Sequence, residues 1–524
     1  MEEFVTKDLS VPDILLVNAN VITLDPSCPR AEMVIIRHGR VTHVGNESDL
    51  KIPVSDESQV IDCRGKTVVP GFNDSHCHFV AFAESLMSCT FQPKQVRSIS
   101  DIQERIRYFA RSTPSGTWIR ARAYDEFYLR EKRHPTRWDL DEATSEHPVK
   151  LTHRSGNGHV LNSMAMAIVG ISNETTEPPG AIIDRELTAG QPNGVLFGMG
   201  PRLSRDIPSM NADDQDKGAR EAYRKLLSSG ITSIQDASSQ NDLDRFKLFA
   251  GWKERGDLGC RVRMMLGFDA FRKHSQKDFS HFLSKDELGI SGVKIILHET
   301  TGRLCPSQTE LNEMVFQVHR SGFQVAVHAV EETTIEAACH AIEYALRKYP
   351  RSDHRHRIEH CSVCPPDLAA RLHSLGITVC TQPSFIFFNG DRYLKTVPRS
   401  QSAHLYPVGT LMKNRVNVCG GSDFPIVPLN PILGIYAAVS RMSDTNEPVL
   451  WEEKITPLEA LRMYTEYPAR ATFEEKIKGT IAPGKLADLA VLSDDPTRVP
   501  TNEIRNIQVK MTILNGKVVW EESD

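Results

Sequence analysis

The middle of the chain repeats one pattern, an amphipathic helical stretch followed by a glycine or short turn and then a short apolar run. Residues 211–229 precede GITSIQDA (230–237), and residues 308–320 precede FQVAVHAV (323–330). Helices that alternate with apolar strands predict a parallel sheet whose outer side the helices cover. Roughly eight such units favour a closed, TIM-like (β/α)8 barrel. An open doubly wound sheet would require a glycine-rich phosphate turn, which we do not find in the sequence.

The two ends of the chain are instead rich in Val and Ile. Residues 13–24 and 33–44 are typical of short strands, and the last fifty residues contain further strand-like runs around the turn Asn515-Gly516. Neither end has enough strands for a core of its own, so we expect both ends to form one composite β-sandwich domain. The predicted boundaries are 1–66 and 476–524 for this domain, and 67–475 for the barrel.

Composition narrows the class of protein. The 524 residues carry a net charge of -5, with 62 basic and 67 acidic residues interspersed. The absence of a basic stripe argues against a nucleic-acid partner, and the lack of a long apolar run argues against a membrane partner. The acidic N-terminus and eleven cysteines without a paired framework favour a reducing, cytoplasmic location. We expect a small-molecule substrate, and the sequence leaves a homodimer open.

The stretch VVPGFNDSHCHF (68–79) contains two histidines that are spaced to bind a metal ion. Its apolar residues predict a short buried strand that ends near His76 and His78. Side chains at i and i+2 of a strand project to the same side, so both imidazoles can reach one metal ion. An isolated His-x-His pair is more often structural, so the interpretation depends on partners elsewhere in the chain.

Further candidate ligands lie in or just past other strand-like runs. The residues, in chain order, are Lys294, His328, His360 and Asp423. In a (β/α)8 barrel the carboxyl ends of the strands meet at one rim, where reactive groups gather. With His76 and His78, these residues make a binuclear set of nitrogen and oxygen ligands.

Around these residues the chain resembles the amidohydrolase superfamily of metal-dependent barrels. Within it, the likeness is to the branch of YtcJ-like and N-substituted formamide deformylase-like proteins, and it covers nearly the whole length. The most specific segments are PGFNDSHCHF (70–79), RIEHCSV (357–363), GGSDFPIVPLNPILGIYAAVSR (420–441) and KGTIAPGKLADLAVLSDDP (478–496).

The resemblance implies a role for each candidate ligand. His76 and His78 are expected to hold the more buried metal, and His328 and His360 the second. Lys294 is expected to bridge both as a carbamate, because an ammonium has no lone pair for a metal. Asp423 is expected to bind the first metal and to accept a proton from the attacking water, as the catalytic residue. The implied cofactor is zinc, one or two ions, with other divalent metals open.

The sequence departs from the family pattern near the expected mouth of the site. His298-Glu299 replaces an Asp-Gly pair after the strand lysine, and Glu331-Glu332 replaces a Gly-Asp pair after His328. His298 is open to interpretation as a substrate contact, a hydrogen-bond donor to a ligand, an alternative ligand or a structural residue. The substrate-binding candidates are Tyr124, His159, His298 and Gln382.

Together these features predict a metal-dependent hydrolase of a non-peptide amide-type C–N bond, in an amide, formamide or imide. Two alternatives stay open. One is a deaminase or a carbamate or ester hydrolase on the same site, because water activation does not select the carbonyl. The other is a non-catalytic barrel with a binding or regulatory role.

Overall fold

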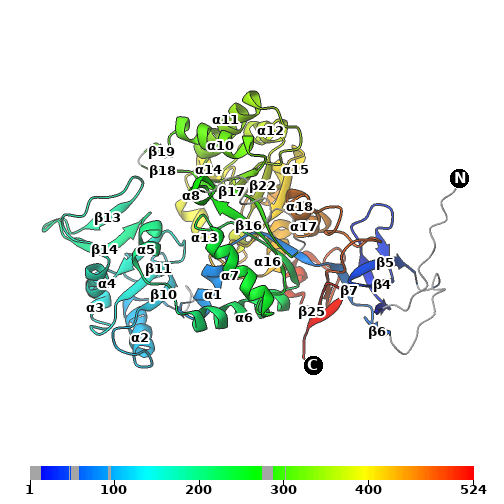
Figure 1. The fold of residues 1–524 in the computed structure, drawn as a ribbon, viewed down its shortest axis with the longest axis horizontal. Coiled ribbons are helices and arrows are strands. Elements are labelled where there is room, and N and C mark those ends of the chain that lie inside the picture. Colours follow the sequence, from blue (N-terminus) through cyan, green and yellow to red (C-terminus); the bar gives the residue numbers. More distant parts are fainter. Residues whose placement is uncertain are drawn as a thin grey trace.

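A computed structural model describes residues 13–46, 48, 58–91, 96–273, 287–300 and 302–523. At its centre lies a parallel barrel of eight strands, which confirms the predicted fold class (Figure 1). In spatial order the strands are β8 (Phe72–Cys77), β15 (Ile231–Asp236), β16 (Arg261–Gly267), β17 (Leu288–Ile296), β20 (Gln324–Ala329), β21 (Arg357–His360), β22 (Thr378–Thr381) and β23 (Asn417–Gly420).

The barrel closes where the chain beyond β23 meets β8. The Asp423 amide donates to the His76 carbonyl at 2.8 Å, and the His78 amide donates to the Phe424 carbonyl at 3.0 Å. These bonds join the first strand of the barrel to the last, which lie some 340 residues apart in the chain. Closure therefore brings the ends of β8 and β23 to one point of the rim.

The helices between the strands cover the outside of the barrel, as their sequence pattern predicts. They include α6 (Ala212–Ser228), α7 (Leu243–Glu254), α10 (Gln308–Arg320), α11 (Glu332–Lys348) and α12 (Pro366–Ser374). Asn211 caps α6 by accepting from the Asp214 amide, and Gly230, with a φ of +73°, reverses the chain into β15. Ser307 and Glu310 form a capping box at the start of α10.

Both ends of the chain pair with each other, as expected for a composite β domain. β7 (Thr67–Pro70) lies between β2 (Asn20–Ile22) and β24 (Leu489–Leu492) in a six-stranded sheet. A four-stranded sheet packs beside it, formed by β1 (Ile14–Val17), β4 (Met33–Arg37), β5 (Arg40–Gly45) and β6 (Gln59–Asp62). The turn at Asn515 joins β25 (Val509–Leu514) to β26 (Lys517–Glu521).

Another six-stranded sheet is inserted between β8 and β15 and projects as a separate lobe, on the left of Figure 1. The strands of this insertion lobe are β9 (Cys89–Thr90), β10 (Ile119–Tyr124), β11 (Val149–His153), β12 (Gly158–Leu161), β13 (Ile182–Arg185) and β14 (Pro192–Phe197). Its apolar face packs on α2 (Ile99–Ala110). The sequence reasoning assigned this region to the barrel and did not foresee a separate sheet.

Candidate metal centre

All six predicted ligands line one cavity of about 430 Å³ at the carboxyl rim of the barrel. The ring centroids of His76 and His360 are 4.7 Å apart, and those of His328 and His360 are 4.4 Å apart. His78 Nε2 lies 3.0 Å from Asp423 Oδ1, and His76 Nε2 lies 3.6 Å from the same oxygen. Nitrogen and oxygen atoms at this spacing are suited to hold a divalent cation.

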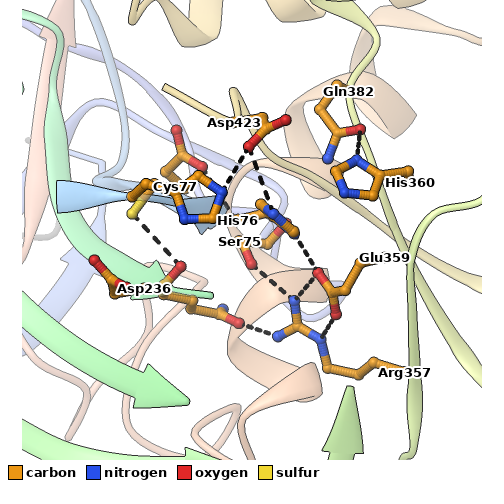
Figure 2. Close-up of polar contacts among 12 residues, drawn as sticks. Ser75, His76, Cys77, Asp236, Arg357, Glu359, His360, Gln382 and Asp423 are labelled. Carbon is orange, nitrogen blue, oxygen red and sulfur yellow. Dashed lines mark hydrogen bonds and ion pairs between the residues drawn. The ribbon is translucent and has the colours of Figure 1, made fainter. Parts of the chain in front are cut away.

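Three of the histidines have their Nδ1 atoms occupied by neighbours. His76 Nδ1 lies 2.5 Å from Glu359 Oε2, and His360 Nδ1 lies 2.9 Å from Gln382 Oε1 (Figure 2). His78 Nδ1 lies 2.9 Å from Ser238 Oγ. A carboxylate can only accept, so His76 Nδ1 carries the proton and Nε2 keeps its lone pair. Such partners orient metal-binding imidazoles and fix their tautomer.

A buried ion pair beneath His76 was not found from the sequence. Arg357 and Glu359 are fully buried on β21, and Glu359 accepts from Arg357 at 2.7 and 3.0 Å. Arg357 also donates to the Ser75 carbonyl at 2.8 Å, so the pair supports both the side chain and the backbone of β8. The available signal was the motif Arg-x-Glu inside a buried strand, where charges are expected only if they are paired.

The backbone around Asp423 holds its carboxylate in the cavity. Asp423 has a φ of +58° and His360 a φ of +72°. Residues other than glycine adopt this left-handed backbone conformation only where the surrounding structure constrains them. The Ser422 hydroxyl donates to the Asp74 carboxylate at 2.6 Å and so anchors the backbone just before Asp423 to β8. Burial opposes the charge on Asp423, but the hydrogen bond to His78 and the nearby imidazoles lower its pKa to about 2.

Lys294 reaches the same cavity from β17. Its side chain is buried, and its Nζ atom has no hydrogen-bond partner among the described residues. Burial lowers the pKa of Lys294 to about 8, although Glu359 and Asp423 favour the charged form. A buried amine without a partner is costly as an ammonium, and an amine with this pKa can react with carbon dioxide. The residues present therefore fit a divalent metal site, to which Lys294 would contribute oxygen ligands once carbamylated.

The surroundings of His76 and His328 favour the neutral imidazole, the form that binds a metal. Burial and the charge of Lys294 lower the pKa of His76 to about 3. Burial, His360 and Lys294 lower the pKa of His328 well below its ordinary value. Protons therefore do not compete with a metal for these nitrogen atoms near neutral pH.

The four predicted substrate-binding residues lie at different distances from the cavity, and only His159 lines it. His159 lines the cavity together with the six predicted metal ligands. Gln382 instead contacts His360 Nδ1 on the side of the ring away from the cavity. Tyr124 lies in the core of the insertion lobe, where its hydroxyl is 3.0 Å from His134 Nδ1. His298 lies on the short hairpin strand β18 (His298–Thr300), against Gly180 of the lobe. For all four residues, contact with a substrate stays a prediction.

A second group with metal-binding side chains, Asp125, Glu126 and His153, lies in the insertion lobe. Arg392 of α13 (Ser384–Thr396) already pairs with it, at 2.8 Å from Asp125 and 3.0 Å from Glu126. A guanidinium in this position neutralises the carboxylates without a cation. We interpret the group as one of the contacts that join the lobe to the barrel.

Within the described part of the chain, no helix has both the length and the apolar composition needed to cross a bilayer.

Imidazole, lysine and carboxylate groups gather at the carboxyl rim of a parallel barrel. This combination is typical of metal-dependent hydrolases. The sequence profile of the amidohydrolase family matches residues 59–520. The chain therefore belongs to the amidohydrolase family, as the sequence motifs indicated.

Two curated relatives match over almost their full lengths. The chain is 28% identical over 552 residues to the N-substituted formamide deformylase of Arthrobacter pascens, covering 98% of this chain and 99% of that protein. It is 27% identical over 518 residues to the putative amidohydrolase YtcJ of Bacillus subtilis, covering 94% and 97%. An uncharacterized metal-dependent hydrolase from Pyrococcus horikoshii has the same fold, with a TM-score of 0.75, 22% identity and coverage of 93% and 99%.

Proposed function

We propose that this protein hydrolyses a non-peptide amide-type C–N bond, in an amide, formamide or imide, with one or two divalent ions, zinc first among them. The observation that carries the proposal is the convergence of six side chains, from the ends of five barrel strands, on one cavity. The full-length similarity to a protein named N-substituted formamide deformylase supports the choice of bond.

The proposed ligands are His76, His78, Lys294 as a carbamate, His328, His360 and Asp423. A divalent ion bound there would lower the pKa of water and polarise a carbonyl oxygen. Asp423 would accept the proton of the attacking water, because its low pKa keeps the carboxylate ionised at the cavity wall. The same carboxyl would then deliver the proton to the leaving nitrogen.

The test combines metal analysis with a substrate panel. Purified protein is expected to contain one or two divalent ions per chain and to hydrolyse at least one N-substituted formamide, amide or imide. Asp423→Asn should lower kcat on that substrate by about 10²-fold or more, because general-base catalysis alone contributes this much. Asp213→Asn, at an exposed position on α6, is the matched control and should keep full activity.

Full activity in Asp423→Asn, or protein without metal after gentle purification, would contradict the proposal. The same panel includes aminopurines, esters and carbamates, so turnover of these and not of amides would favour the deaminase or ester-hydrolase alternative. Turnover of any of them would exclude the non-catalytic alternative. The cytoplasmic location and a homodimer stay predictions.

A further inference from the structure

One face of the insertion-lobe sheet forms the outer wall of the metal cavity. Arg120 pairs with Lys150 across β10 and β11, and Arg122 pairs with Thr152. Thr152 in turn pairs with His159 on β12. Paired residues share a face of a sheet, and all five of these side chains line the cavity that also holds the candidate metal ligands. The alternate residues Ile119, Ala121, Val149 and Leu151 form the apolar core of the lobe on the opposite face.

We call this face of the lobe, with Arg120, Arg122, Lys150, Thr152 and His159, the cationic wall, because the cavity beside it contains far more positive than negative charge. Away from the metal ligands, the charged residues that line the cavity are Arg120, Arg122, Lys150, Arg245 and Glu84. Four cationic side chains thus face one carboxylate. No ion pair joins Glu84 to any of them among the described residues. A cavity lined by one sign of charge with partly buried walls concentrates ligands of the opposite sign.

Two of the four cations have structural duties. Arg122 donates to the Ala81 carbonyl at 2.9 Å and so ties the lobe to α1 (Phe79–Leu86). Arg120 donates to the Pro208 carbonyl at 2.5 Å. Lys150 and Arg245 differ, because their charged ends make no hydrogen bond or ion pair within the part of the chain that the structure describes. Burial and the neighbouring Arg120 and Arg122 disfavour the charge on Lys150, and Glu84 offsets them only in part, so a bound anion would stabilise this ammonium.

His159 supplies an independent indication that a ligand binds here. Only 4% of the residue is exposed, and its Nδ1 atom lies 3.2 Å from the Thr152 hydroxyl. Its Nε2 atom is buried and has no partner among the described residues. Buried polar atoms are nearly always hydrogen-bonded in native structures, so an orphaned nitrogen that lines a cavity indicates a missing ligand or water.

We propose that Lys150 and His159 of the cationic wall, together with Arg245 of α7, bind an anionic oxygen group of the substrate, a carboxylate or a phosphate, while the scissile bond lies at the metal ligands. This inference rests on the proposed function and specifies the substrate class. The preferred substrate is then an N-acyl or N-formyl compound that carries an acidic group on its amine side or acyl side. Neutral N-substituted formamides become poorer substrates, because they leave the cationic wall without a counterion.

The first experiment measures binding without hydrolysis. Phenylacetate, benzylphosphonate and 2-phenylethanol share an aromatic body, contain no amide bond and differ in the charge of the end group. Calorimetric titration of the metal-loaded protein should show binding of one or both anions and not of the alcohol. The stronger anion identifies carboxylate or phosphate as the preferred group.

Variants locate the binding. Lys150→Met should weaken anion binding by roughly tenfold to a hundredfold, the value of a lost charge-assisted hydrogen bond. Lys150→Arg should retain binding, and Lys517→Met, an exposed lysine on β26, should behave as the wild type. Arg245→Met, from α7 and outside the lobe, gives a second test should Lys150→Met fail to fold. An anion that binds only to the metal would bind equally to every variant and would overturn the inference.

Turnover separates this inference from the proposed function. The wild type should prefer an N-formyl amino acid over its neutral methylamide, and Lys150→Met should lose that preference chiefly through KM. If the wild type hydrolyses neutral amides but binds neither anion and shows no preference for the charged substrate, the anion site is refuted and the proposed function is left intact. Lysine-dependent anion binding without hydrolysis of any amide would refute the proposed function alone.

Discussion

Replacing Glu359 by Gln tests whether the buried ion pair beneath the metal site supports both stability and metal binding. Glu359 accepts from Arg357 Nε at 2.7 Å and Nη2 at 3.0 Å, and from His76 Nδ1 at 2.5 Å. A Gln amide keeps one oxygen but turns an NH2 group toward at least one of these donors. Arg357 then loses the only carboxylate partner that it has among the described residues.

Breaking a buried pair by neutralising one member costs about 3–5 kcal/mol, because a buried charge is left uncompensated. We therefore expect the free energy of unfolding of Glu359→Gln to fall by about 3 kcal/mol or more. Loss of the partner that orients His76 should weaken metal affinity by roughly 10–100-fold. Urea denaturation measures the first quantity, and competition with a chelator measures the second.

Two controls separate the causes. Glu221→Gln removes an exposed pair with Arg224 and should cost no more than about 1 kcal/mol. The double variant Arg357→Met with Glu359→Gln removes both buried charges and should recover part of the stability, by about 1 kcal/mol or more, while metal affinity stays low. The prediction is wrong if Glu359→Gln loses no more free energy of unfolding than Glu221→Gln, or if its metal affinity equals that of the wild type.

Three further predictions concern the same rim. Gly421→Ala should weaken metal binding and lower stability by about 1–3 kcal/mol, because an added Cβ would lie 2.8 Å from the His76 amide and Cβ; unchanged chelator competition would contradict this. Lys294→Ala should lose activity and regain part of it with added acetate or propionate, whose oxygens replace those of a carbamate; no rescue in kcat would argue against the carbamate bridge. Removing metal with a chelator should lower Tm in the wild type and have little effect in His76→Ala, as measured by thermal denaturation.

Several features of the site could be predicted from the sequence because they follow from local pattern. The spacing of His76 and His78 on an apolar run places both side chains on one side of a strand in any sheet. Lys294, His328, His360 and Asp423 follow strand-like runs, and parallel strands must end at a common rim. The structure brings all six to one cavity for this reason.

The insertion lobe shows where local pattern fails. Its strands have only two to six residues, so their periodicity is too short to identify a sheet of their own. Arg120, Lys150 and His159 belong to three different strands, and only the register between those strands places them on one face. The cationic wall is therefore a property of strand pairing that no single segment encodes.

The sequence by itself determined the barrel, the pairing of both chain ends and the identity of the candidate ligands, because alternation, turn residues and strand ends are properties of short segments. Only the tertiary structure decided that Glu359 and Arg357 lie beneath His76, and that the lobe turns its charged face toward the metal ligands. Those contacts join residues far apart in the chain, and burial gives them their energy. Burial exists only once the barrel has closed.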